Sequence, residues 1–161
     1  MKQISKQTLT MLALLLPLLS PAAAQDGTAV NRAIVTNPLT GVAMDGFDPV
    51  SYFTDPQPAE GRGDFELVWG GVAWQFSSAA NREIFNRAPQ IYAPQYGGYG
   101  AMGVARGYLS RGNPQLYAVF KQRLYFFYSA ANREAFLLSP DKAARDGIAH
   151  WEKLGASSVL E

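Results

Sequence analysis

The most recognisable chemical pattern in this chain is the stretch Gly98–Gly103, which reads Gly-Tyr-Gly-Ala-Met-Gly and fits the spacing G-x-G-x-x-G. In dinucleotide-binding proteins this pattern follows a strand, opens a helix and precedes an acidic residue about 20 positions later. Here a proline-containing turn precedes the pattern, and no acidic residue lies near Ala118. The glycines therefore predict a sharp bend or a close approach of the backbone to another surface, not a nucleotide site.

Tyrosines gather around the same glycines and make this stretch the main candidate for a binding surface. A tyrosine ring combines an apolar body with a polar hydroxyl group, which suits contact with a ligand or a partner protein. The candidate residues are Tyr92, Tyr96, Gly98, Tyr99, Gly100, Met102 and Tyr108. The alternative is that these rings simply cap the hydrophobic core.

Residues able to catalyse a reaction or bind a metal are few. The chain has one histidine, His150, and no cysteine, so a Ser-His-Asp triad or a histidine-based metal site would have to use that residue. His150 lies beside Trp151 without a recognisable partner motif. The candidates for a metal site are therefore Met102 and His150. No catalytic residue is assigned, and the sequence predicts a protein that is not an enzyme.

An internal repeat sets the elements that would position these residues. The segment Ser78–Phe85 recurs 51 residues later as Ser129–Phe136, identical at seven of eight positions. A fixed self-similarity of this kind indicates a repeated structural unit. Arg82 and Arg133 recur within it, and duplicated residues of this kind usually hold duplicated structure; an anion site at either arginine is the alternative.

Each copy contains two apolar runs around a short break, followed by a serine and a helix. Gly70-Gly71 accepts the positive φ angles of a two-residue turn, and Lys121-Gln122 stands at the matching place. We predict an α+β fold in which two pseudo-repeated β-hairpin–helix units, about 65–87 and 116–138, form one antiparallel sheet packed by helices.

Two further helices are expected. Asp48-Pro49 is typical of a helix start, with the aspartate as N-cap and the proline in the first turn, and predicts a short helix that ends at Phe53. A last amphipathic helix is expected over 139–154, with Ile148, Trp151 and Leu154 on its apolar side.

The N-terminal residues predict a secretory signal peptide over 1–24. Lys2 and Lys6 precede the apolar run Leu9–Leu19, and small residues lead to an expected cleavage after Ala24. The run is shorter than the roughly 20 residues of a membrane-spanning helix, so no stable membrane anchor is expected after cleavage. The sequence thus predicts a periplasmic or secreted protein with a flexible leader over 25–41 and a single domain over 42–161.

Composition limits the partners of this domain. The predicted signal peptide holds two of the 14 basic residues and none of the 13 acidic ones, so the remaining chain has a formal net charge of −1. A near-neutral chain gives no reason to expect binding to nucleic acid. Because an exported chain without cysteine has no disulfides, the eight tyrosines, nine phenylalanines and three tryptophans must hold the fold by packing.

Three stretches of the chain resemble the exported YHS-domain proteins of bacteria. These are GFDPVSYF at 46–53, WQFSSAANR at 74–82 and PQIYAPQYGGY at 89–99. The resemblance covers about 42–154 and implies a YHS-like domain associated with metal handling, copper in particular.

The resemblance also implies where metal ligands would stand. In the metal-associated forms one cysteine follows Asp-Pro-Val and two more flank the turn into the helix, positions that hold Ser51, Ser77 and Asn81 here. The exported forms usually have a cysteine after Gly-Gly-Tyr and often a histidine a few residues later, positions that hold Gly100 and Tyr108 here. None of these residues is the thiolate that Cu(I) prefers.

We therefore expect an exported, non-enzymatic binding or accessory module with no cofactor. Its glycine- and tyrosine-rich loop would contact an unknown small ligand or a periplasmic protein. The alternative is a periplasmic copper or haem-related carrier with ligands other than cysteine.

Overall fold

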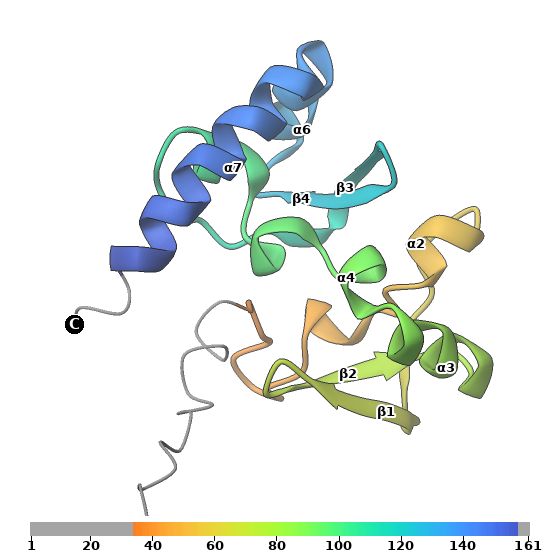
Figure 1. Cartoon of the computed structure of the whole chain (residues 1–161). Coiled ribbons are helices and arrows are strands. Elements are labelled where there is room, and N and C mark those ends of the chain that lie inside the picture. The colour runs from red at the N-terminus through yellow and green to blue at the C-terminus, as the bar shows by residue number, and fades with distance from the viewer. Residues whose placement is uncertain (1–33, 158–161) are drawn as a thin grey trace, which may run out of the picture.

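The computed structural model describes residues 34–157, and the predicted signal peptide and most of the predicted leader lie outside the described residues. Helices and short strands alternate along the chain (Figure 1). The elements are η1 (Met44–Gly46), α2 (Ser51–Thr54), β1 (Arg62–Trp69), β2 (Val72–Phe76), α3 (Ala79–Arg87), α4 (Pro89–Tyr92), η2 (Gln95–Gly98), α5 (Ala101–Ala105), β3 (Asn113–Phe120), β4 (Arg123–Phe127), α6 (Ala130–Leu138) and α7 (Pro140–Ser157).

The α+β fold is confirmed, but the expectation of one antiparallel sheet is wrong. β1 pairs with β2 and β3 pairs with β4, so the strands form two separate two-stranded sheets. The reason lies at the edge of β2 that faces away from β1 and at the edge of β4 that faces away from β3. Each edge is met by a loop of its own unit, through the parallel bridges Val42–Ala73 and Gly100–Phe126. Neither strand is therefore left free to pair with the other.

The two hairpin–helix units match each other element by element. Each has an eight-residue strand, a five-residue strand and a nine-residue helix. The predicted turns are confirmed: Gly70-Gly71 and Lys121-Gln122 both have positive φ angles, although only the first pair is glycine. Ser78 caps α3 and Ser129 caps α6, because each serine hydroxyl accepts the backbone N–H three residues on.

The units begin earlier in the chain than the sequence indicated. A turn with three consecutive positive φ angles precedes each hairpin, at 44–46 and at 96–98. Its last glycine then accepts a backbone hydrogen bond from the start of the hairpin, Gly61 N to Gly46 O at 2.8 Å and Gly112 N to Gly98 O at 3.2 Å. In each unit the turn is thus hydrogen-bonded to the start of the hairpin.

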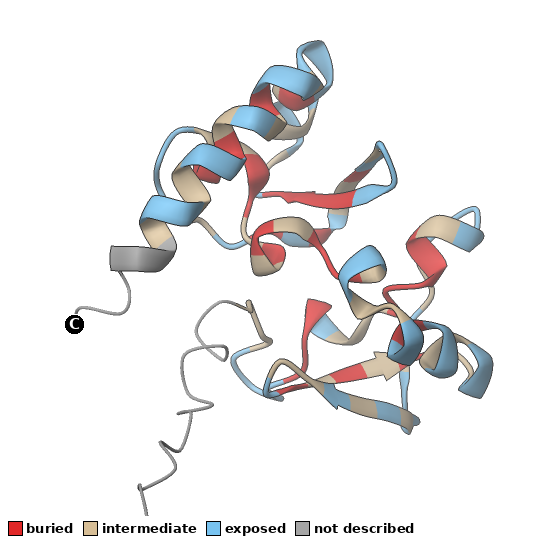
Figure 2. Ribbon diagram, viewed as in Figure 1, coloured by how far each residue is buried: buried red, intermediate tan, exposed pale blue. Residues whose placement is uncertain are grey.

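Buried residues occur in both units (Figure 2), and aromatic side chains fill the two cores. Phe85 of α3 is fully buried, 5.1 Å from the Trp74 ring, and Phe136 of α6 is fully buried, 5.0 Å from the Tyr125 ring. Burying a ring of this size contributes about 1.5–3 kcal/mol relative to leaving it in water. Packing of repeated aromatic positions therefore holds a fold that has no disulfide.

Two details of the predicted helices were wrong. The first helix begins at Ser51 rather than Pro49, although the Asp48 carboxylate accepts the N–H of Val50 as a capping residue would. Ile148, expected on the apolar side of the last helix, is 54% exposed. α7 instead faces the domain through Gly147, whose backbone lies against Tyr96, and through the predicted residues Trp151 and Leu154.

The described part of the expected leader is held against the domain. Val35 donates its N–H to Gly97 O at 2.8 Å, and the Arg111 guanidinium donates to Thr36 O at 2.7 Å. None of the helices within 34–157 has the length and apolar character needed to cross a membrane.

Candidate functional site

Tyr96, from the candidate binding loop, is a core residue. Only 7% of it is exposed, its ring lies 5.9 Å from Trp151, and its hydroxyl donates to Ala144 O at 3.1 Å. Burial raises the pKa of Tyr96 well above its usual range. The residue fixes α7 to the second unit and offers no surface to a ligand.

The other tyrosines of this loop point to different places. Tyr92 packs edge-to-face on Phe53, 5.5 Å away, in the first unit. Tyr99 packs against Trp151 in the second unit, at 6.0 Å, and Tyr108 is 48% exposed. The structure therefore does not bring the predicted rings together on one surface, and most of them cap the core.

The glycines of the loop serve close backbone packing, as the sequence indicated. Gly98 has a φ angle of +90°, which favours glycine. A Cβ atom at Gly100 would lie 2.9 Å from the Ser110 Oγ, and one at Gly103 would lie 2.7 Å from it. The Ser110 hydroxyl is itself buried and has no hydrogen-bond partner among the described residues.

The two metal candidates belong to different surroundings. Met102 lines a hollow of about 230 Å³ between α5, α6 and α7, together with Asp146. The His150 ring packs over Gly107, and its Nδ1 lies 3.0 Å from Asp146 O. Within residues 34–157, no group of three or more histidine, aspartate or glutamate side chains is placed to hold a metal ion.

A buried aspartate gathers the positions that the family resemblance pairs with metal ligands. Asp48 is fully buried, and its Oδ2 accepts hydrogen bonds from the Ser77 N–H (2.9 Å), the Ser77 hydroxyl (2.7 Å) and the Asn81 amide (2.7 Å). The Ser51 hydroxyl donates to Asp48 O at 2.7 Å. The carboxylate is satisfied by these donors, so this Asp48 cluster holds the first unit together.

An open hollow lies along β3. A hollow of about 530 Å³ extends over Gln115–Val119, the start of α6 and Tyr52 of α2. A second hollow of about 380 Å³ adjoins it, shares Gln115 and Tyr117, and is closed by Phe47 and the 57–58 loop. We call the two hollows together the β3 groove; Figure 1 shows β3 between α6 and α2.

Fixed side chains form the walls of the β3 groove. Tyr52 donates its hydroxyl to Pro114 O at 3.0 Å and meets the Tyr117 ring edge-to-face at 4.9 Å. Burial raises the pKa of Tyr52 far above its usual range, which keeps the hydroxyl protonated as a donor. Arg133 donates its Nε–H to Tyr117 O at 2.7 Å. These contacts connect α2 and α6 to β3.

Sequence reasoning identified one residue of the groove and missed the rest. Arg133 stood out because it recurs in the repeat, whereas Tyr52 and Tyr117 carried no local signal. Tyr52 bonds to Pro114, 62 positions later in the chain, and packs on Tyr117, and no sequence motif predicts these contacts.

Comparisons of this chain with protein-family models, with curated proteins and with solved structures found no match. Its resemblance to YHS-domain proteins stays a prediction, and function must be argued from the site.

Proposed function

We propose that this protein is an exported binding module that catalyses no reaction and holds a small ligand, or a short segment of a partner protein, in the β3 groove. The observation that carries the proposal is the pair of adjoining hollows that share Gln115 and Tyr117. Binding sites are commonly concave and carry a few placed polar groups that fix the orientation of the ligand.

Preorganisation of the walls supports this proposal. A ligand that enters a rigid site does not have to order the side chains that it meets, and this lowers the entropic cost of binding. Tyr52 and Arg133 are each held by a hydrogen bond to a β3 carbonyl group. The exposed Arg133 side chain is therefore offered to a ligand in a fixed position, and the buried Tyr52 supports the strand that lines the groove.

The proposed contact surface differs from the glycine- and tyrosine-rich loop. The rings of Tyr96 and Tyr99 pack against Trp151, and the Tyr96 hydroxyl is bonded to α7. Contact with a ligand through these rings would require α7 to move away. The β3 groove is open without any such change.

A fragment screen by amide NMR on the ¹⁵N-labelled protein tests the proposal. We expect fragments to shift the amide resonances of β3 and of the first turn of α6. Ala130→Trp, which places a large ring at the groove, should abolish these shifts. Ala79→Trp is the matched control, because Ala79 occupies the equivalent exposed position at the start of α3.

Two results would contradict the proposal. Fragments that shift amides of residues 92–108 and leave β3 unchanged would favour the loop. Fragments whose binding survives Ala130→Trp would place the site outside the β3 groove.

A further inference from the structure

We infer that the ligand of the β3 groove is an organic anion, a carboxylate or similar group on an apolar body, and that Arg133 recognises its charge. This inference rests on the proposed function. It adds the chemical class of the ligand, which the proposed function leaves open.

The position of the Arg133 guanidinium is suited to an anion. Its Nε–H is bonded to Tyr117 O, and Nη1 lies 3.2 Å from the Glu134 carboxylate. A guanidinium group has five N–H donors in a fixed plane, so three donors remain after these two contacts. The Arg133 side chain is 40% exposed. An anion can therefore reach a cation whose orientation is already fixed.

Exposed apolar side chains beside Arg133 offer contacts to an apolar body. Val119 is 41% exposed and Leu137 is 45% exposed, both beside Arg133 in the larger hollow. A ligand that covers them removes apolar surface from water, which is favourable in proportion to the area covered. No aspartate or glutamate lines either hollow, and Arg133 is the only charged side chain in their linings.

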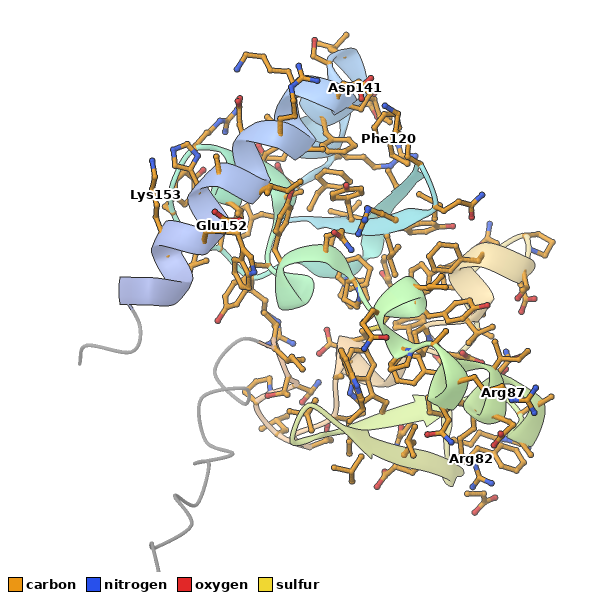
Figure 3. All side chains as sticks on the ribbon, viewed as in Figure 1. Arg82, Arg87, Phe120, Asp141, Glu152 and Lys153 are labelled. Carbon is orange, nitrogen blue, oxygen red and sulfur yellow. The ribbon has the colours of Figure 1, made fainter. Side chains whose placement is uncertain are left out.

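The surroundings of the recurring arginine differ between the two units. Arg82 of α3 stands at the position equivalent to Arg133, 51 residues earlier. It lies far from Phe120, which ends β3 (Figure 3). The position equivalent to Tyr117 is Glu66, whose carboxylate accepts a hydrogen bond from Gln75. An acidic side chain there would repel an anion. The strand position is thus acidic in the first unit and a tyrosine in the second, whereas the glutamate that follows the arginine is common to both units.

The test uses two probes that differ in one charged group: anilinonaphthalene sulfonate, and N-phenylnaphthylamine, which is the same molecule without the sulfonate. Binding of each is measured by the rise in probe fluorescence. Arg133→Met should weaken binding of the sulfonate probe about five- to tenfold, the range expected for a charged hydrogen bond at a half-exposed site. Its effect on the uncharged probe should be less than about twofold, a change within the usual effect of a surface substitution.

A second variant guards against misfolding, since Arg133 also supports the Tyr117 carbonyl group. Ala130→Glu places a negative charge in the groove at the first position of α6, where a helix tolerates or gains from an acid. It should weaken the sulfonate probe and leave thermal stability unchanged or slightly higher. Arg82→Met and Ala79→Glu are the matched controls in the first unit and should leave both probes unaffected.

The outcomes separate this inference from the proposed function. If both probes bind with equal affinity and Arg133→Met affects them equally, the groove is a binding site but its ligand is not an anion. If neither probe binds, or if the first-unit variants weaken binding as much as the second-unit variants, the β3 groove itself is not the site. Selective loss of the sulfonate probe in Arg133→Met and Ala130→Glu supports the inference.

Discussion

Replacing Asp48 with asparagine tests whether the buried carboxylate holds the first unit together. The carboxylate accepts three hydrogen bonds at Oδ2, from Ser77 and Asn81, and one at Oδ1, from the N–H of Val50. Asparagine has the same shape, but one of its two polar atoms is a donor. In either orientation, therefore, an amide N–H₂ group must face another donor in a site that is closed to water.

The expected cost follows from the less damaging of the two orientations. The asparagine oxygen would keep the three donors of Ser77 and Asn81, while its N–H₂ group would face Val50 N. A buried donor without a partner costs about 1–3 kcal/mol, and each remaining bond weakens because the acceptor is no longer charged. We expect Asp48→Asn to lower the free energy of unfolding by about 3 kcal/mol.

Urea denaturation followed by tryptophan fluorescence measures this change, with Trp74, which is 1% exposed, as a reporter in the same unit. The midpoint should fall while the slope with denaturant stays constant, which is the signature of a change in stability alone. Asp55→Asn is the control, because Asp55 is exposed and accepts a hydrogen bond from its neighbour Thr54. It should change stability by less than about 0.5 kcal/mol. Equal effects of the two variants would refute the role assigned to Asp48.

Three further predictions concern packing and protonation. Gly61→Ala and Gly112→Ala occupy equivalent positions and should each lower stability by about 2–4 kcal/mol in thermal unfolding, because the new Cβ atoms would lie 2.5 Å and 2.4 Å from backbone atoms. Ser110→Ala should be neutral or raise stability by up to about 1 kcal/mol in urea, since it removes a buried hydroxyl without a partner. Burial raises the pKa values of Tyr52 and Tyr96 above their ordinary 10.0, so the folded state holds these protons more tightly than the unfolded state does. The free energy of unfolding should therefore be constant just below pH 10 and fall as the pH rises above 10. Tyr52→Phe should make that fall less steep.

The hairpins and the helices that follow them could be predicted because their signals are local. A two-residue turn with positive φ angles at Gly70-Gly71 and a serine cap at Ser78 depend on residues within one turn of the chain. The repeat then carried both signals into the second unit. Lys121-Gln122 adopts the same turn without glycine, so the repeat identified a turn that its own residues do not favour.

The arrangement of the two hairpins could not be predicted, because it depends on what meets each strand edge. Nothing in the β2 or β4 sequences shows that the second edge is occupied by the loop that contains Val42 or Gly100. The exposure of Ile148 has a similar cause. Helical spacing placed Trp151 and Leu154 correctly on the side of α7 that packs on the core, but it did not show that Gly147, rather than Ile148, lies against the domain.

The packing of the candidate tyrosines could not be predicted for a related reason. Tyrosines near flexible glycines are compatible with a binding loop and with a packed turn, and the sequence does not separate the two. The β3 groove depends on Tyr52 reaching Pro114 and on Arg133 reaching Tyr117, contacts between separate elements. Only the recurrence of Arg133 in the repeat pointed towards it.

The turn that precedes each hairpin is stabilised differently in the two units, and this difference bears on where the open surface lies. Asp48 and Gly100 occupy the same place in their units, since each donates its N–H to the loop before the hairpin, at Ala59 O (2.9 Å) and Ser110 O (2.8 Å). In the first unit the carboxylate fixes this turn. In the second the turn has no such side chain, and α7 covers it through Tyr96. The second turn and its tyrosines are thereby used in packing, whereas the surface where Tyr52 meets β3 stays open and concave.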